Sequence, residues 1–209
     1  MPDKITDAEG FSKVFDVSRE TTDLLEQYVK LIKKWNSSIN LVSKSTIPDV
    51  WHRHIADSAQ LINHVPSHTP LKWVDIGSGG GLPGIVISVL EKDREPRVDL
   101  SLVESDTRKC VFLRTVVREL GLDVDVIEER IELLPSLNAD VISARAFTGL
   151  SRLLEISANH ANSNTVCLFL KGQTHNAELT EAHENWNINV ESFPSITDST
   201  ARLLKIKGI

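Results

Sequence analysis

A glycine-rich turn, DIGSGGGLPG over residues 75–84, is the part of this sequence best suited to holding a nucleotide-like cofactor. The residues that permit a tight turn are Gly77, Gly79 and Gly81. Without side chains, glycines let a ligand approach backbone amides at the start of the helix that is predicted from Leu82. Such a turn can also merely close a strand–helix corner, so its acidic neighbours must help to decide its role.

Two acidic residues bear on which cofactor the turn could bind. Glu104 ends the next predicted strand, VDLSLVE, where nucleotide-binding sheets place a carboxylate for ribose hydroxyls. Asp75 precedes a GxGxG turn, whereas dinucleotide sites have GxGxxG. The field of Asp75 favours the ammonium of S-adenosylmethionine over a diphosphate. We therefore predict S-adenosylmethionine, with a nicotinamide cofactor and a purely structural turn acceptor at Asp75 as alternatives.

Charged residues also follow two later predicted strands. EERIELLP places Arg130, Ile131 and Glu132 after the third strand, and ISARAF places Arg145 after the fourth. Open α/β sheets bind ligands at the carboxyl ends of their strands. We expect these residues to border the cofactor crevice, with a surface salt bridge as the alternative role of Arg145.

The residues also limit the methyl acceptor. Cys110 and Cys167 lack the spacing of a zinc site or a disulfide framework, and Cys110 shares an apolar helical stripe with Leu113 and Leu120. No metal site and no cysteine nucleophile for pyrimidine carbon methylation are expected. ISARAF lacks the Asn-Pro-Pro-aromatic signature of amine methylation. Guanine N7 carries a lone pair and no proton, so its methylation needs positioning and no general base.

Alternating strands and helices must position these residues. Strands are predicted at LKWVDI, VDLSLVE, VDVIEE, ADVISAR and TVCLFLK, with helices from Leu82, from Asp106, near Leu150 to His160 and near Asn176 to Glu184. This alternation predicts a mostly parallel sheet with helices on both faces, and WNINVESF and ARLLKIKG are expected to pair antiparallel at one edge. Helices over residues 21–36 and Pro48 to Val65 are predicted to form an N-terminal cap.

The overall composition indicates one globular domain. The 209 residues are 41% hydrophobic and 25% charged, which suits a single unit with a helical cap (1–68) and a cofactor-binding core (69–209). No apolar run or secretion signal predicts a membrane association, so a cytoplasmic protein is expected. With a net charge of −6, RNA binding would depend on a local basic patch. There are two candidate patches, and each could equally be a solvated helix face. One consists of Lys30, Lys33, Lys34 and Lys44, and the other of Arg108, Lys109, Arg114 and Arg118.

An ordered set of motifs resembles the bacterial 16S ribosomal RNA guanine-N7 methyltransferases, also called glucose-inhibited division protein B. The motifs are KWNSSINLVS (34–43), RHIADS (53–58), DIGSGGGLPGI (75–85), LVESDTRKCVFLR (102–114), ISARAF (142–147), LKGQ (170–173) and ARLLKIK (201–207). DIGSGGG alone is shared by many methyltransferases. The order of the set over nearly the whole chain makes the resemblance specific.

The resemblance implies a Rossmann-like class I S-adenosylmethionine-dependent methyltransferase with a mostly parallel seven-stranded sheet, an antiparallel edge strand and an N-terminal helical cap. Its implied reaction is methylation of N7 of a guanine in the 530 loop of 16S rRNA. The expected cofactor contacts are Gly77, Leu82, Ile131, Glu132 and Arg145 from the motifs, and Asp75, Gly79 and Glu104 from the physical argument. The expected substrate-positioning residues are Arg145, His54, Asp57 and Lys171, with Asn36, Asn40, Arg53 and Ser58 also in motifs of the RNA side.

Some interpretations of these motifs remain open. His54 and Asp57, three residues apart, could instead form a hydrogen-bonded pair that fixes the cap to the sheet. The family usually has Arg-His where this chain has Arg202 and Leu203, and often has aspartate in place of Glu104. The expected partner is an assembled or assembling small ribosomal subunit with the target base splayed out. The rival functions are a nicotinamide-dependent oxidoreductase and a non-catalytic, cofactor-sensing RNA-binding module.

Overall fold

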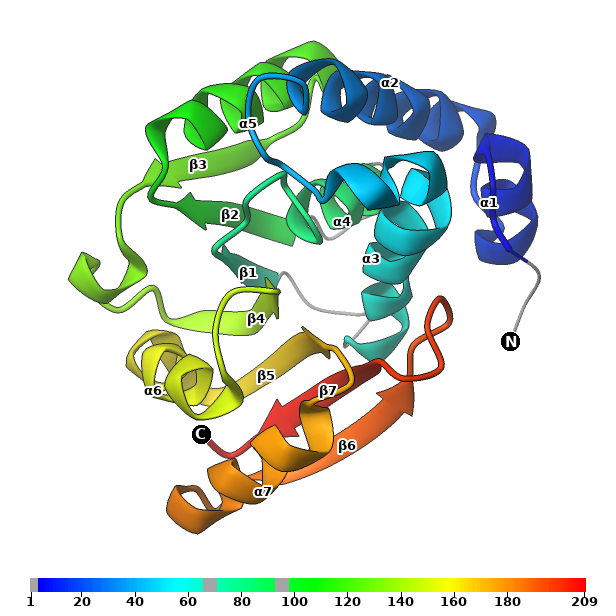
Figure 1. Cartoon of the computed structure of the whole chain (residues 1–209). Helices are drawn as coiled ribbons and strands as arrows, with labels where there is room; N and C mark the ends of the chain where they lie inside the picture. The colour runs from blue at the N-terminus through cyan, green and yellow to red at the C-terminus, as the bar shows by residue number, and fades with distance from the viewer. Residues whose placement is uncertain (1–3, 66–70, 93–97) are drawn as a thin grey trace.

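A seven-stranded sheet forms the centre of the computed structural model, which describes residues 4–65, 71–92 and 98–209 (Figure 1). The strands are β1 (Leu71–Ile76), β2 (Val98–Glu104), β3 (Val124–Glu128), β4 (Ala139–Arg145), β5 (Ala161–Lys171), β6 (Asn189–Pro194) and β7 (Arg202–Lys207). They lie in the order β3-β2-β1-β4-β5-β7-β6. Strands β1 to β5 run parallel, β7 is antiparallel to β5, and β6 pairs antiparallel with β7. The predicted sheet and its antiparallel tail are confirmed.

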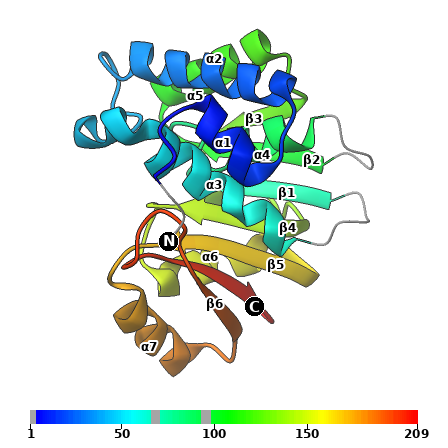
Figure 2. The ribbon, with the colours of Figure 1, turned by 90° about the vertical axis from the view of Figure 1, so that its right-hand side faces the viewer.

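Helices cover both faces of this sheet, as the alternation predicted. Because successive strand residues point to opposite faces, Trp73 packs into the core beneath α4 (Gly84–Glu91) and α5 (Thr107–Leu120), and Val74 into the core beneath α6 (Leu150–His160). Helix α7 (His175–Asn185) adds Ala182 to the second core. Figure 2 shows the strands stacked from β3 to β6 with α1 and α3 in front of them. Cys110 and Cys167 are buried in the described structure, as the apolar stripe predicted for Cys110.

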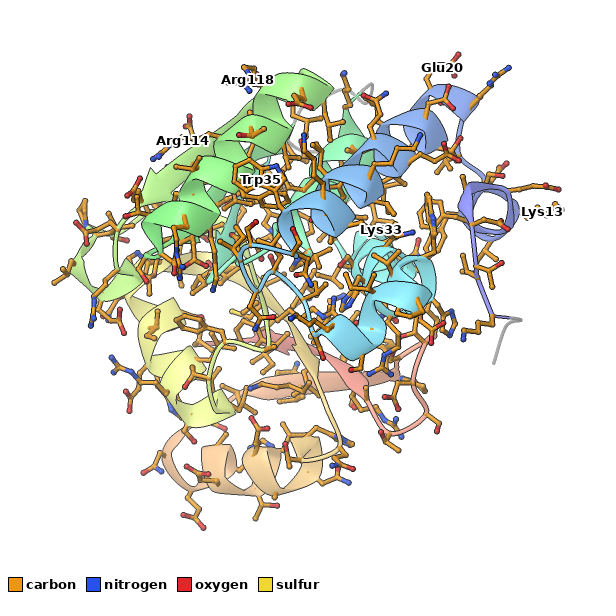
Figure 3. The ribbon with its side chains drawn as sticks, turned by 45° about the horizontal axis from the view of Figure 1, so that its top comes forward. Lys13, Glu20, Lys33, Trp35, Arg114 and Arg118 are labelled. Atoms are coloured by element: carbon orange, nitrogen blue, oxygen red, sulfur yellow. The ribbon has the colours of Figure 1, made fainter. Side chains whose placement is uncertain are left out.

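The N-terminal cap differs from its predicted form. An unpredicted helix, α1 (Ala8–Phe15), begins where the Asp7 carboxylate accepts the Gly10 N–H at 2.8 Å. The predicted first helix is α2 (Arg19–Trp35), which lies against α5 (Figure 3). Trp35 meets Phe112 of α5 edge to face, with ring centroids 5.7 Å apart. The boundary predicted between residues 68 and 69 lies outside the described residues.

The second helix predicted for the cap is replaced in the structure by four short helical segments. They are a 3₁₀ turn η1 (Lys44–Asp49), a π-helical turn η2 (Trp51–Ala56), a single α-helical turn α3 (Asp57–Ala59) and a 3₁₀ turn η3 (Gln60–His64). Pro48 lies inside η1 and not at the first turn of a long helix. A π-helical turn shifts the angular spacing of the side chains that follow it, so RHIADS is presented differently from a regular α-helix.

Candidate active site

The glycine turn joins β1 to α4 at the carboxyl edge of the sheet. Gly77, Gly79 and Gly81 have φ of 64°, 56° and 85°, the left-handed region that glycine enters without steric cost. The predicted tight turn is therefore confirmed, although α4 begins at Gly84 and not at Leu82. The Tyr28 hydroxyl donates to the Gly80 carbonyl at 2.5 Å, so the turn is fastened to α2 of the cap.

Asp75 lies beneath this turn, with none of its surface exposed. Its carboxylate accepts hydrogen bonds from the Ser143 hydroxyl at 2.7 Å and from the Gly84 N–H at 3.2 Å. Burial raises the pKa of Asp75 to about 6, against the opposing effect of the Ser143 hydrogen bond. The structure thus gives Asp75 the turn-acceptor role that was the alternative prediction, and it does not place the carboxylate in contact with the cavities described below.

Glu104 ends β2 beside the turn and organises the backbone around it. Its Oε2 accepts the Gly79 N–H at 2.9 Å, and its Oε1 accepts the N–H groups of Ser105 and Asp106 at 2.8 and 2.9 Å. Only 7% of the residue is exposed. Oε1 thus uses both of its lone pairs, whereas Oε2 keeps a second one, so Glu104 can accept from a ligand hydroxyl at Oε2 without losing these bonds.

Three neighbouring cavities open around this edge, and the first lies between the ends of β2 and β3. This β2–β3 cavity has a volume of about 370 Å³. Its walls include Gly77, Glu104, Arg130, Ile131, Glu132, Ala146 and Phe147. The structure therefore brings together four of the predicted cofactor residues, Gly77, Glu104, Ile131 and Glu132, although they are up to 55 positions apart in the printed sequence.

The second cavity lies between the cap and the glycine turn and also measures about 370 Å³. This turn cavity is lined by Asn40, Leu41, Val42, Ser43, Thr46, Arg53, His54, Gly77, Ser78, Gly79, Gly80, Leu82, Lys109, Arg145 and Ala146. Gly77 borders both cavities. A cofactor that spans them would cross the glycine turn at this residue, where a side chain would obstruct it.

His54 contributes a neutral ring to the turn cavity. The Thr46 hydroxyl donates its one hydrogen to the Ser43 carbonyl at 2.7 Å, so at 2.7 Å it accepts from His54 Nε2. This assigns the proton to Nε2 and leaves the buried Nδ1 as an acceptor without a hydrogen-bond partner among the described residues. Burial, aided by the charges of Arg145 and Arg53, lowers the pKa of His54 to about 3. His54 is therefore uncharged at neutral pH.

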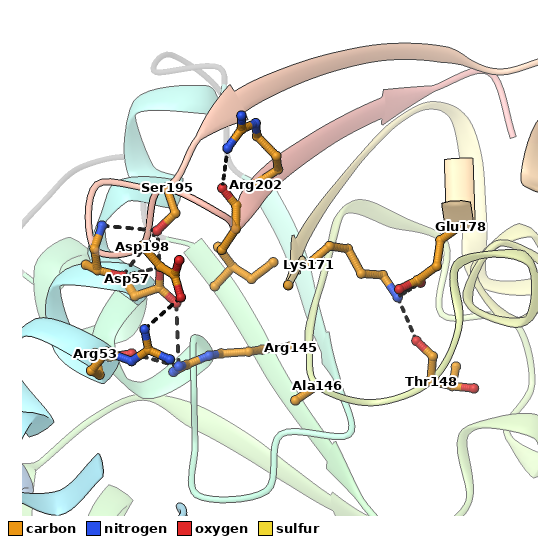
Figure 4. Close-up of a pocket in the computed structure, with 14 residues that line it drawn as sticks. Arg53, Asp57, Arg145, Ala146, Thr148, Lys171, Glu178, Ser195, Asp198 and Arg202 are labelled. Atoms are coloured by element: carbon orange, nitrogen blue, oxygen red, sulfur yellow. Dashed lines mark hydrogen bonds and ion pairs between the residues drawn. The ribbon is translucent and has the colours of Figure 1, made fainter. Parts of the chain in front are cut away.

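The third cavity, of about 340 Å³, opens at the ends of β4 and β5 (Figure 4). Strand pairing places Arg145 opposite Leu170, and Lys171 opposite Arg202. The charged residues that line this β4–β5 cavity are Arg53, Asp57, Arg145, Lys171, Glu178, Asp198 and Arg202, and Ser195 lies among them. The β6–β7 loop that carries Ser195 and Asp198 had no predicted role.

Arg145 stands in the wall between the turn cavity and the β4–β5 cavity. Its Nη2 donates to the Arg53 carbonyl at 2.7 Å and lies 3.5 Å from Asp57 Oδ2. Its Nη1 is buried and has no hydrogen-bond partner in the described structure. Burial lowers the pKa of Arg145 from its usual value, and Asp57 opposes that shift. Arg145 thus carries a donor that a bound anion or carbonyl could accept.

Asp57 connects the cap to the β6–β7 loop. Its Oδ1 accepts from the hydroxyls of Ser195 and Thr197 at 2.9 and 3.0 Å and from the Gln60 amide at 2.9 Å. His54 bonds to Thr46 instead, so the hydrogen-bonded His54–Asp57 pair considered above is wrong. Its supposed effect is nevertheless present, because Asp57 itself fixes the cap to the sheet edge.

Lys171 lines the β4–β5 cavity with its ammonium already engaged. Nζ donates to the Thr148 carbonyl at 2.7 Å and to Glu178 Oε2 at 2.8 Å, and 9% of the side chain is exposed. Figure 4 shows Lys171 reaching toward Glu178 and Thr148, on the opposite side from Arg145 and Arg53. It therefore holds the loop after β4 and helix α7 at the end of β5.

The other RNA-side candidates divide into cavity and support residues. Asn40 and Arg53 line cavities, whereas Asn36 is buried and accepts the N–H groups of Leu41 and Val42, both at 2.9 Å. Ser58 is fully buried. Arg202 donates to the carbonyls of Ser199 and Ala201 at 2.9 Å, which orders the entry into β7.

Phe147 and Ala146 were not among the predicted site residues. The Phe147 ring lies directly over Gly77, where a Cβ on Gly77 would overlap it, and 39% of Phe147 is exposed. Ala146 has φ of 49° and borders all three cavities. Non-glycine residues in this region often mark functional sites. The only sequence signal was their position directly after Arg145 in ISARAF.

Comparison with known proteins gives matches over nearly the whole chain. A family model described as rRNA small subunit methyltransferase G matches residues 21–204. Ribosomal RNA small subunit methyltransferase G of Cereibacter sphaeroides is 47% identical over 194 residues, which cover 93% of this chain and 94% of the relative. The protein of the same name from Parvibaculum lavamentivorans is 45% identical over 208 residues, covering 99% and 91%.

Solved structures share the fold at low sequence identity. A SAM-dependent methyltransferase from Aquifex aeolicus superposes with a TM-score of 0.58 at 13% identity, covering 77% of this chain and 94% of that one. TYW2 of M. jannaschii in complex with AdoMet gives 0.54 at 12% identity, covering 83% and 80%. These likenesses confirm the predicted fold class.

Proposed function

This chain belongs to the rRNA small subunit methyltransferase G family, and from that premise we propose that it methylates N7 of a guanine in the 530 loop of 16S rRNA, with S-adenosylmethionine as the methyl donor. The observation that supports this most directly is the meeting of three cavities at Ala146. Two of them share the glycine turn and the third opens beside it, as a cofactor and an acceptor base require.

The described residues fit S-adenosylmethionine in the β2–β3 and turn cavities. Glu104 has a free lone pair on Oε2 of its buried carboxylate, which suits a ribose hydroxyl. Gly77, which borders both cavities, has no side chain to obstruct a cofactor that passes from one cavity to the other. The buried Arg145 Nη1 and His54 Nδ1 have no hydrogen-bond partners among the described residues, so each can bind a polar group of the cofactor or substrate. When bound, the cofactor supplies a methyl group on a sulfonium.

The β4–β5 cavity is our candidate for the acceptor base, since it lies beside the turn cavity across Arg145. Guanine N7 is an unprotonated acceptor, so no residue needs to remove a proton before transfer. The neutral His54 ring and the engaged Lys171 ammonium are consistent with positioning roles. Asp57 holds the cap and the β6–β7 loop at fixed places around this cavity. The cap and the core thus act as one methyltransferase domain.

The decisive experiment is methylation of small subunits purified from cells that lack the enzyme. We expect label from radioactive S-adenosylmethionine in a single guanine of the 530 loop, as 7-methylguanine, with little label when Arg145→Ala replaces the wild type. Label at another position would refute the guanine assignment. If no label entered the RNA while the cofactor still bound, the non-catalytic RNA-binding module would be favoured.

Two comparisons sharpen the proposal. In calorimetry, S-adenosylmethionine should bind and NAD(H) should not; the reverse result would favour the oxidoreductase. Naked 16S rRNA and protein-bound subunits should differ as substrates, because a base splayed from its loop depends on the assembled shape of the RNA. Equal rates on both would contradict the expected ribosomal context.

A further inference from the structure

A stretch of the cap carries an excess of positive charge within an acidic chain. Residues 27–48 contain four lysines and no aspartate or glutamate, although the whole chain has a net charge of −6. The stretch includes the second half of α2, the loop after it and most of η1. Lys33, Lys34 and Lys44 are exposed. We call these three side chains the lysine surface.

The lysine surface lacks the carboxylate partners that neutralise other basic residues. Across residues 4–65, 71–92 and 98–209, no ion pair involves Lys33, Lys34 or Lys44, whereas Lys30 lies 3.6 Å from Glu26. The rival strip on α5 is paired throughout. Its nitrogen-to-oxygen distances are 3.5 Å for Arg108–Asp106, 4.0 Å for Lys109–Glu104, 2.7 Å for Arg114–Glu128 and 3.9 Å for Arg118–Glu119. The positive field of α5 is therefore largely cancelled at close range.

The two basic regions also face different directions. Figure 3 shows Lys33 on the side of α2 away from α5, and Arg114 and Arg118 on the far side of α5. The loop after α2 supplies Asn40, Leu41, Val42 and Ser43 to the turn cavity, and Lys44 follows immediately. The lysine surface thus continues to the rim of the candidate site. Lys109 of the α5 strip also lines the turn cavity, but its ammonium lies 4.0 Å from the Glu104 carboxylate.

From these observations we propose that the lysine surface docks the sugar-phosphate backbone of the RNA substrate beside the turn cavity. This inference rests on the proposed function, because it names how the same site receives its RNA. An ammonium next to a phosphate releases condensed counterions, which gives affinity without reading sequence. In this arrangement the cavities, and not the lysine surface, select the base. Of the two basic patches considered from the sequence, the proposal assigns RNA binding to the one on the cap.

Lys33 and Lys34 also lie in the last turn of α2, where cations stabilise a helix through its dipole. A purely structural role of this kind predicts lower stability of the lysine variants and an unchanged salt dependence of RNA binding. Docking predicts the opposite pattern. The two roles are therefore separated by measuring both quantities.

The test compares two triple variants that each remove three positive charges. The first combines Lys33→Gln, Lys34→Gln and Lys44→Gln; the matched control combines Arg108→Gln, Arg114→Gln and Arg118→Gln. Binding to small subunits is measured over a range of salt concentrations, together with KM and kcat for methylation. S-adenosylmethionine affinity by calorimetry and unfolding by urea are followed in the same proteins.

We expect the lysine variant to raise KM for subunits roughly tenfold or more and to reduce the slope of log affinity against log salt by about 2, as three lost contacts to an RNA strand imply. Its kcat at saturation and its cofactor affinity should match the wild type, and the arginine control should change neither KM nor slope. Equal effects of the two variants, or an unchanged slope in the lysine variant, would overturn the proposal. Failure of the wild type to methylate subunits would instead refute the proposed function.

Discussion

The buried carboxylate of Asp75 should make the protein less stable as the pH rises, and Asp75→Asn should remove this effect. In the folded protein, burial raises the pKa of Asp75 to about 6 from a usual 3.8. The unfolded chain therefore loses this proton at lower pH than the folded chain does. Between these two pKa values the folded state binds more protons, so the free energy of unfolding falls with increasing pH.

The size of the effect follows from the shift. A difference of about 2 pKa units corresponds to about 3 kcal/mol over the full titration. From about pH 4.5 to about pH 7.5, the accessible part is about 2 kcal/mol. The amide of Asn cannot accept from both donors that now face Asp75, Ser143 and Gly84, and this loss costs about 1–3 kcal/mol at every pH. The constant cost does not alter the predicted slope.

Urea unfolding of both proteins across this pH range measures the difference directly. Protonation of His54 in the unfolded state, where its pKa is higher than the folded value of about 3, lowers stability in acid. That contribution is present in both proteins and cancels in their difference. Asp99→Asn, which neutralises an exposed carboxylate on β2, is the control and should follow the wild type. If the free energies of unfolding of Asp75→Asn and the wild type changed with pH in parallel, the raised pKa of the buried Asp75 would be refuted.

The remaining predictions concern the surroundings of Gly77. Gly77→Val should abolish cofactor binding and lower the free energy of unfolding by about 1–2 kcal/mol, because valine at a positive φ is strained and would overlap Phe147. The control is Gly149→Ala, which has open space around it and should leave the calorimetric affinity for S-adenosylmethionine unchanged. Phe147→Ala should bind S-adenosylhomocysteine more tightly, since the ring no longer covers Gly77, and weaker binding would show that the ring packs on the ligand. Arg145→Ala should remain folded in urea titrations yet lose methylation, and full activity would remove Arg145 from the site.

Much of the architecture followed from local patterns. The strand segments such as LKWVDI and ADVISAR are apolar on both faces because helices cover both faces, so their boundaries at β1 and β4 were predicted as observed. The cap was less predictable. The periodicity of Trp51 and Ile55 resembles that of a long helix, but packing against the β6–β7 loop through Asp57 occurs in a segment that changes from 3₁₀ to π to α geometry.

The sequence by itself determined the positive-φ glycine turn, the acid at the end of β2 and the order of motifs that identifies the family. These features depend on residue types and near neighbours in the chain. Only the tertiary structure decided that Asp75 is buried beneath the turn and that Phe147 covers Gly77. It also decided that the cations of α5 are paired, while Lys33, Lys34 and Lys44 of the cap have no ion pair among the described residues. Burial and ion pairing depend on which distant segments meet, and a one-dimensional pattern does not specify those meetings.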